Sequence, residues 1–322
     1  MGNFDQVTRL TTHTSVAAAL SRLSDDELSD LLARAEPNGS GIGGPTAVLD
    51  VAGTRVFVKR LPLTDLELRP ENAGSTANLY DLPVHLHYGV GLVGAVGFGA
   101  WRELAVQTMT TNWVLKGERD GFPLMYHWRV LPHPGQTLSG ELDQAIGYWG
   151  PVISPRLEAL RASKSSIALF LEYIPQNLHD WLNGQDDLEP ACEMVERELR
   201  TGVEFMNSRG LLHFDGHFQN VLTDGERLYF ADFGLAISSA FDLSEEEIAF
   251  FAENQDYDRH YTATHLVMWF ACALRSQGVP PRVAAVLNRH NEVAAVMKDF
   301  YRRFQHESRR TPYPAADLRS VR

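Results

Sequence analysis

The chain has 322 residues, with 29 Lys and Arg against 41 Asp and Glu, and it carries a formal net charge of −12 at pH 7. Binding to nucleic acid depends on a basic surface, so this balance argues against a nucleic-acid partner, whereas it tolerates a cationic substrate. The length exceeds that of one average domain, and an apolar content of 44% is enough for a substantial core.

Cysteine content and targeting signals favour a cytoplasmic protein with no membrane partner. Cys192 and Cys272 lie in apolar contexts with no second metal ligand nearby, so neither a disulfide framework nor a zinc site is expected. The N-terminal region lacks the basic and apolar segments of a secretory signal. The longest apolar run, at residues 264–274, is too short to span a bilayer.

The first 36 residues predict a helical extension. Ser24 is followed three residues later by Glu27, which is a capping-box pattern, and the apolar spacing beyond it predicts a helix through Leu32. A strand between this helix and the glycine-rich segment that comes next is therefore expected to be short or missing.

Residues 39–44 read Gly-Ser-Gly-Ile-Gly-Gly, which places Gly39, Gly41 and Gly44 in the spacing G-x-G-x-x-G. Residues 55–61 alternate as a strand does, and Lys59 lies on this strand fifteen residues after Gly44. Because a proline follows the glycines at once, a flexible connector is the alternative interpretation of this loop.

A second glycine-rich run, at residues 89–99, precedes a predicted helix that starts near residue 101 and carries Glu103. Glu67 and Glu71 are other candidate partners for Lys59 and are closer to it in the sequence. They lie, however, in a stretch rich in Pro, Asn and Gly that is typical of a loop. The second run could form a mobile lid, an alternative phosphate-contacting loop, or a tight, irregular connection. The sequence does not decide which of the two runs would cover phosphates.

Residues 167–174 predict an apolar strand that includes Glu172 and ends at Ile174, and Asn177 then caps a short helix. Residues 189–208 have apolar positions at helical spacing, and Gly210 is placed to end that helix.

The most informative pattern is formed by two blocks in the second half of the chain. His213-Phe-Asp215 is followed by Asn220, five residues after the aspartate, and then by Asp232-Phe-Gly234. Residues 220–223 and 227–231 predict two strands joined by an Asp-Gly turn, which would bring Asn220 and Asp232 together. The alternative interpretation is that these are ordinary turn residues. The order and spacing of the two blocks would then be a coincidence.

The pattern H-x-D-x-x-x-x-N followed by D-F-G at this separation resembles the protein-kinase-like superfamily. The resemblance implies an α+β, bilobal fold with a β-rich N-lobe that carries insertions and a mainly helical C-lobe. The implied boundaries are a helical extension at 1–36, an N-lobe at 37–174 that ends in a hinge, and a C-lobe at 175–322.

The same resemblance implies magnesium and ATP as cofactors and assigns roles to individual residues. Asp215 would orient the attacking hydroxyl and accept its proton, while Asn220 and Asp232 would bind the metal. Lys59, positioned by Glu103, would contact the α- and β-phosphates. The positions expected to contact the nucleotide through their backbone are Gly39, Gly41, Gly44, Glu172 and Ile174. The preference for ATP over GTP stays open.

Departures from the family patterns bear on the kind of kinase but leave the choice open. His217 stands where Ser/Thr protein kinases have a lysine, and H-x-D-x-H-x-x-N is closer to aminoglycoside phosphotransferases and choline kinases. No A-P-E block follows Gly234, which also favours a hydroxyl-bearing small molecule as acceptor. The full D-F-G spelling keeps a Ser/Thr protein kinase, with a protein substrate, as the alternative. A nucleotide-binding pseudokinase is a third interpretation.

A group of acidic residues follows the second block: Glu245, Glu246, Glu247, Glu253, Asp256 and Asp258. It would suit the amines of an antibiotic or other cationic acceptor, but acidic residues also complement a helix N-terminus, and Ser244 with Glu247 predicts one here. Residues 283–304 carry an apolar stripe that predicts a final core helix.

Overall fold

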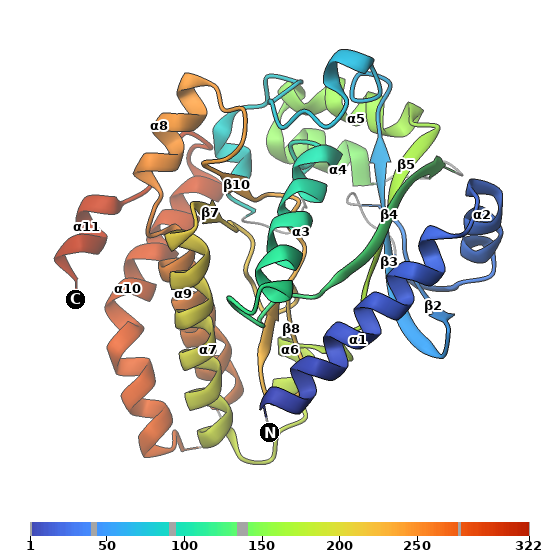
Figure 1. The fold of residues 1–322 in the computed structure, drawn as a ribbon. Coiled ribbons are helices and arrows are strands. Elements are labelled where there is room, and N and C mark those ends of the chain that lie inside the picture. The colour runs from blue at the N-terminus through green and yellow to red at the C-terminus, as the bar shows by residue number, and fades with distance from the viewer. Residues whose placement is uncertain (1, 40–43, 90–94, 134–140, 276–277, 322) are drawn as a thin grey trace. The chain divides into compact units, whose positions relative to one another are not determined.

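The computed structural model describes residues 2–39, 44–89, 95–133, 141–275 and 278–321 (Figure 1). The chain forms two compact units. The first unit comprises Met1–Leu82 and Val93–Tyr173, and the second comprises Pro83–Leu92 and Ile174–Arg322. The first unit contains a β-sheet and the second is mainly helical, so the α+β class expected from the sequence is confirmed, and the architecture is compatible with a bilobal kinase-like fold.

The first unit is built on a five-stranded sheet in which every neighbouring pair is antiparallel. In spatial order the strands are β1 (Glu36–Gly39), β2 (Thr46–Val51), β3 (Thr54–Leu63), β5 (Ser165–Glu172) and β4 (Met125–Pro132). The first strand is present but has only four residues, because helix α2 ends just before it.

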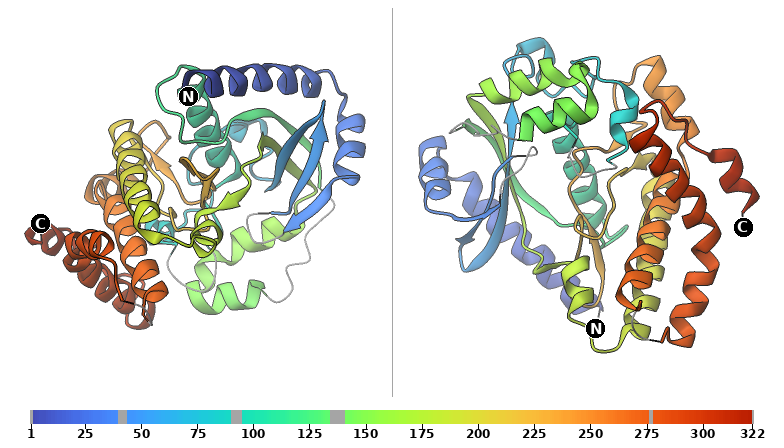
Figure 2. Two further views of the ribbon diagram at one scale, coloured as in Figure 1. Left: turned by 90° about the horizontal axis from the view of Figure 1, so that it is seen from below. Right: turned by 180° about the vertical axis from the view of Figure 1, so that it is seen from behind.

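Helices surround this sheet within the first unit. They are α1 (Gly2–Ser21), α2 (Asp25–Ala33), α3 (Ala100–Leu115), α4 (Glu141–Trp149) and α5 (Ser154–Ala162), together with the 3₁₀ turns η1 (Pro70–Asn72) and η3 (Pro151–Ile153). The capping box of Ser24 and Glu27 opens α2. Helices α1 and α2 contact β2 and β4 (Figure 2). The core between α3 and the sheet contains Leu61, Leu63, Ala100, Leu104, Met125, Ile167, Leu169 and Leu171.

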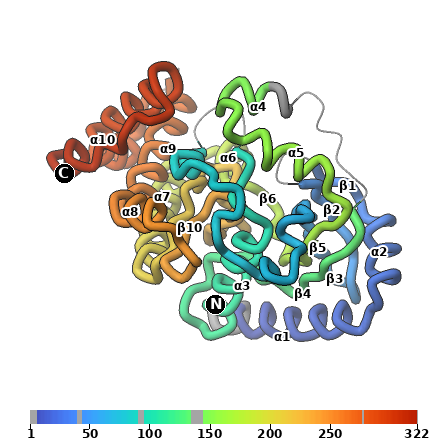
Figure 3. The backbone as a smooth tube through the Cα atoms, turned by 90° about the horizontal axis from the view of Figure 1, so that it is seen from above, coloured from blue at the N-terminus to red at the C-terminus, as the bar shows by residue number. Residues whose placement is uncertain are grey.

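The second unit is mainly helical, and α7, α9 and α10 pack against one another (Figure 3). Its helices are α6 (Leu178–Asn183), α7 (Leu188–Ser208), α8 (Glu245–Glu253), α9 (Tyr257–Ala273), α10 (Pro281–His306) and α11 (Ala315–Ser320). Short strands form two small sheets, one of β6 (Gln176–Asn177), β8 (Val221–Thr223) and β9 (Leu228–Phe230), the other of β7 (Leu211–Leu212) and β10 (Ile237–Ser238). Gly210 ends α7 with a φ of 70°, which a glycine adopts without strain.

A short segment from the first half of the chain belongs to the second unit. It includes the 3₁₀ turn η2 (Val84–His87) and Tyr88, whose hydroxyl donates to Asn254 Oδ1 at 2.8 Å. The Tyr88 ring lies 5.2–5.7 Å from the rings of Phe214, Phe250, Tyr257, Phe300 and Phe304. The aromatic cluster groups the described residues 83–89 with the second unit, although they fall inside the stretch 37–174 that the sequence suggested as a continuous N-lobe.

Candidate active site

Lys59 and Glu103 form a buried ion pair in the first unit. Lys59 lies on β3, and its Nζ donates to Glu103 Oε1 at 2.7 Å, with each side chain only 9% exposed. Glu103 stands in the first turn of α3, where a carboxylate also interacts favourably with the helix dipole. The ion pair fixes the lysine against the sheet, as a phosphate-contacting lysine requires.

Glu67, the alternative partner for Lys59, has a different role. Its carboxylate accepts from Arg156 Nη1 at 2.8 Å and from the backbone N–H of Ala100 at 2.8 Å, at the start of α3. Burial alone would raise the pKa of Glu67, but Arg156 and the Thr64 hydrogen bonds outweigh burial and lower it. Glu67 therefore holds the helix that carries Glu103. Glu71 is exposed, in η1.

Replacing Glu103 by glutamine is expected to lower the free energy of unfolding by about 3 kcal/mol, because it removes the carboxylate that compensates a buried ammonium group. The double variant Lys59→Met with Glu103→Leu should be less destabilised than Glu103→Gln. Urea unfolding measures both. The control is Glu204→Gln in the exposed pair with Arg200, which should cost less than about 0.5 kcal/mol. Equal losses in Glu103→Gln and in the control would contradict a buried, energetically important pair.

The first glycine-rich loop begins two strands away from Lys59 and ends against its neighbour Arg60. Gly39 pairs with Thr46 across β1 and β2, and Thr46 pairs with Lys59 across β2 and β3. Gly44 has a φ of 107°, and a Cβ there would overlap the carbonyl oxygen of Arg60, so the fold itself requires glycine. Gly41 and residues 90–94 of the second glycine-rich run lie outside the described residues.

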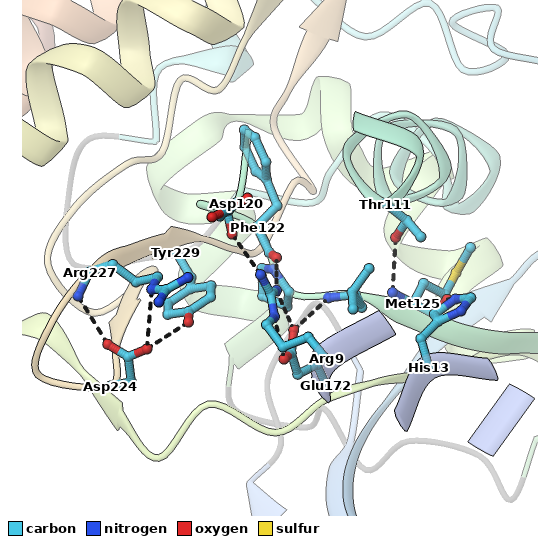
Figure 4. Close-up of polar contacts among 12 residues, drawn as sticks. Arg9, His13, Thr111, Asp120, Phe122, Met125, Glu172, Asp224, Arg227 and Tyr229 are labelled. Carbon is cyan, nitrogen blue, oxygen red and sulfur yellow. Dashed lines mark hydrogen bonds and ion pairs between the residues drawn. The ribbon is translucent and has the colours of Figure 1, made fainter. Parts of the chain in front are cut away.

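Glu172 ends β5 at the boundary of the first unit, and Ile174 is the first residue of the remaining part of the second unit. The backbone N–H of Glu172 donates to Leu124 O at 2.8 Å. Its carboxylate is engaged by Arg9, whose Nε and Nη2 donate at 2.8 and 2.6 Å (Figure 4). The backbone N–H and the side chain of Glu172 are therefore both engaged within the first unit.

Arg9 was not predicted as a site-supporting residue. Besides Glu172, it donates from Nη1 to Asp120 O at 3.1 Å and from Nη2 to Phe122 O at 2.9 Å. The residue is only 8% exposed. Helix α1, which the sequence suggested as an extension, thus contributes a buried cation to the end of β5.

We expect Arg9→Met to lower the free energy of unfolding by about 3–5 kcal/mol, because it leaves a buried carboxylate without its cation. Nucleotide affinity should fall as well, because Glu172 loses its fixed position. Thermal unfolding and nucleotide titration measure the two effects. The control is Arg129→Met, which breaks an exposed pair between β4 and Asp25 of α2 and should cost about 1 kcal/mol or less. An Arg9→Met protein as stable as the control would refute this role.

In the second unit, Asp215 follows β7 in a loop that its neighbours hold in place. Asn220 Nδ2 donates to Asp215 Oδ2 at 2.9 Å and to the Asp215 carbonyl oxygen at 3.1 Å. His217 Nε2 lies 3.6 Å from Asp215 Oδ1. Because the amide nitrogen of Asn220 makes both bonds, its Oδ1 is the atom suited to a metal ion.

The loop is anchored from α9 by Asp258, which the sequence suggested only as one of several acidic residues. The backbone N–H groups of His213 and Phe214 donate to the two carboxylate oxygens of Asp258 at 2.6 and 2.8 Å. Asp258 is 1% exposed, and burial raises its pKa to about 6 despite these hydrogen bonds. No local pattern marks this residue, because its partners lie more than forty positions away.

The β8–β9 hairpin brings the two sequence blocks together. Ala231 N donates to Asn220 O at 3.0 Å, and His213 Nε2 lies 3.1 Å from Ala231 O, one residue before Asp232. Phe214 and Asp232 have φ values of 63° and 62°, which are uncommon for residues other than glycine and cluster at functional sites. At the hairpin turn, Asp224 accepts from Tyr229 Oη at 2.7 Å (Figure 4).

Burial controls the histidines of this loop. It lowers the pKa of His213 to about 4 and that of His217 below its ordinary value, although the charge of Asp232 opposes both shifts. Both rings are therefore neutral at pH 7 and act as hydrogen-bonding groups. Asp232 is exposed.

Gly89 lies directly against Asp215. A Cβ at Gly89 would be 2.7 Å from Asp215 Oδ1 and 2.7 Å from Leu235 Cδ1. Gly89→Ala is therefore expected to displace the Asp215 carboxylate and to lower turnover on the order of 100-fold, with little change in nucleotide affinity. Steady-state kinetics and nucleotide titration check this. Gly147→Ala, where no atom lies within 4 Å of the new Cβ, is the control, and equal activities would contradict the displacement.

Apart from Asp258, part of the acidic group of the C-terminal half begins a helix. Glu245, Glu246 and Glu247 form the first turn of α8, where Ser244 and Glu247 complete a capping box. This arrangement supports the interpretation that these carboxylates complement a helix N-terminus. Among the described residues, no cluster of three or more His, Cys, Asp or Glu side chains is arranged to hold a metal ion by itself.

Comparison with known proteins adds a distant similarity. No protein-family profile matches the chain. The CTD kinase subunit alpha of Saccharomyces cerevisiae is 27% identical over 125 residues, which are 38% of this chain and 21% of that protein. The chain therefore has a distant relative among kinase subunits, and it matches about a fifth of that relative's length. In the part of the chain that the structure describes, no helix is long and apolar enough to cross a membrane.

Proposed function

We propose that the protein is a magnesium- and ATP-dependent phosphotransferase that acts on a hydroxyl group. The observation that carries this proposal is the arrangement of Asp215, Asn220 and the hairpin that leads to Asp232, within one unit. Asp215 would accept the proton of the acceptor hydroxyl as its oxygen bonds to the γ-phosphorus and the bond from that phosphorus to the ADP oxygen breaks.

The donor atoms of the site fit magnesium and nucleotide. Mg²⁺ prefers oxygen ligands, keeps several waters and is commonly held by one or two carboxylates together with substrate phosphates, so a cluster of three protein carboxylates is not needed. Asn220 Oδ1 and the Asp232 carboxylate would supply the protein ligands. Lys59, fixed by Glu103, would bind the phosphates, and bound metal would neutralise the developing charge.

A small-molecule hydroxyl is the first candidate for the acceptor. His217, in place of the lysine of protein kinases, and the lack of an A-P-E block in the sequence support it. A Ser/Thr protein kinase is the second candidate, supported by the D-F-G spelling and by the distant similarity to a kinase subunit. The intact set of Lys59, Asp215, Asn220 and Asp232 argues against a pseudokinase.

The test is to incubate the purified protein with magnesium, γ-labelled ATP and an extract of its host, and then to separate labelled protein from labelled small molecules. Label in a new small molecule that is absent with Asp215→Asn would support the first candidate. Label in protein would support the second. A near-normal Asp232→Ala enzyme, or nucleotide binding without any transfer, would refute the proposed mechanism.

A further inference from the structure

The second unit contains a cavity of about 860 Å³ next to the catalytic loop. Such a volume is in the range of small-molecule sites. Gly89 and His217 line it, and each also contacts Asp215: His217 Nε2 is 3.6 Å from Asp215 Oδ1, and Gly89 packs against the same oxygen. One end of the cavity therefore borders the proposed catalytic base.

One wall of the cavity is aromatic. Tyr261, His265 and Trp269 follow one another at intervals of four residues, so they share one face of α9, and Phe218 and Tyr301 add two further rings. The rings of Tyr261 and His265 are 4.5 Å apart. Burial lowers the pKa of His265 to about 3, so this ring is neutral and contributes to the wall as a flat, uncharged surface. A flat ring of a ligand can stack on such a wall.

Helix α10 contributes basic side chains to the lining. Lys298, Arg302 and His306 follow one another at intervals of four residues and all line the cavity. Arg302 is held by Asp299 and Glu307, at 2.8 and 2.7 Å. Among the described residues, those that line this cavity include no aspartate or glutamate. Lys298 would therefore repel a cationic acceptor here, and no carboxylate among these lining residues would offset that repulsion.

We infer that this cavity binds the acceptor and that the acceptor is an aromatic alcohol with an anionic group such as a carboxylate. The inference rests on the proposed function. The hydroxyl is directed to Asp215, the ring stacks on the face formed by Tyr261, His265 and Trp269, and the anion pairs with Lys298. This is the opposite charge from the cationic acceptor that the acidic composition of the chain suggested.

Three probes that share one scaffold and differ in charge test the inference: para-(hydroxymethyl)benzoate, benzyl alcohol and para-(hydroxymethyl)benzylamine. Cys272 reports on occupancy, because it is exposed and lines the cavity. Cys192 is buried, and burial raises its pKa to about 12, so it alkylates slowly. The measurements are the dissociation constant of each probe and the protection of Cys272 from alkylation, with and without Mg-ATP.

The benzoate is expected to protect Cys272 and to bind about tenfold more tightly than the benzylamine. Lys298→Gln should weaken benzoate binding about fivefold, the effect of losing an ion pair worth about 1 kcal/mol, and should leave benzyl alcohol binding nearly unchanged. Arg303→Gln, on α10 but outside the cavity lining, is the matched control and should behave as wild type. Equal binding of all three probes, tighter binding of the benzylamine, or no protection of Cys272 would overturn the inference.

Hydrolysis of Mg-ATP without any probe separates this inference from the proposed function. If the wild-type protein hydrolyses Mg-ATP and the benzoate does not protect Cys272, the inference about the cavity is wrong and the proposed function stands. If the benzoate protects Cys272, with the expected loss in Lys298→Gln, but Mg-ATP neither binds nor turns over, the cavity remains an anion-selective site and the proposed function is wrong.

Discussion

Asp215→Asn is expected to lower the rate of phosphate transfer by about 10²–10⁴-fold, the usual contribution of a general base. The loop should keep its conformation, because the new side-chain carbonyl can still accept the hydrogen bond that Asn220 donates to Asp215 Oδ2. Nucleotide affinity should therefore change little. Single-turnover transfer from γ-labelled ATP measures the rate, and a nucleotide titration measures the affinity.

Asp186→Asn is the matched control for this change, because Asp186 is an exposed aspartate of the same unit that lies outside the proposed site. Its transfer rate should equal that of the wild type. If Asp215→Asn retains a similar rate, Asp215 is not the base. If it loses nucleotide affinity in parallel with rate, the residue serves the structure of the loop rather than the chemistry.

Asp258→Ala is expected to lower the free energy of unfolding by about 2–6 kcal/mol. The substitution leaves the backbone N–H groups of His213 and Phe214 buried without their acceptor, and each such group costs about 1–3 kcal/mol. Urea unfolding at pH 7 measures the loss. A variant as stable as the wild type, with His213 and Phe214 still protected from hydrogen exchange, would show that Asp258 does not anchor the loop.

The stability contributed by Asp258 should also depend on pH. Burial raises its pKa in the folded protein to about 6, above the ordinary value of 3.8. A carboxyl with a raised pKa stabilises the folded state most below pH 4, and this contribution is lost as pH rises through about 6. The stability of Asp258→Asn relative to the wild type should therefore rise by about 2.4 kcal/mol between pH 4 and pH 7. A difference that stays constant over this range would contradict the raised pKa.

Local patterns predicted the helices and strands well, because their determinants are close in the sequence. The capping boxes that begin at Ser24 and Ser244, and the Asp-Gly turn after Thr223, all appear in the structure as expected. The pairing of Lys59 with Glu103 was expected from the family resemblance, which implies a glutamate on the first large helix, and loop composition argued against Glu67.

The features that the sequence did not predict depend on contacts between distant parts of the chain. Arg9 lies 163 residues from Glu172, and Asp258 lies 45 residues from His213. Neither Arg9 nor Asp258 has a periodic or capping pattern around it. Both bind backbone groups, which are the same in every residue type, so the partner residues leave no signal in the sequence. The packing of Tyr88, which follows the 3₁₀ turn η2, was not predicted for a similar reason. Its aromatic partners are spread over the second half of the chain.

The second unit draws residues from two parts of the chain, the described residues 83–89 and the part that begins at Ile174. A single proteolytic cut after Tyr173 would therefore leave residues 83–89 covalently attached to the first unit, and the fragment that begins at Ile174 would be linked to them only by noncovalent contacts. A recombinant fragment that begins at Ile174 would lack Tyr88, whose ring packs among the aromatic side chains at the centre of the second unit. The units are thus not interchangeable modules. In a chimera with one junction at Tyr173, one protein would supply most of the core of the second unit and the other protein would supply the residue at position 88 that packs within it.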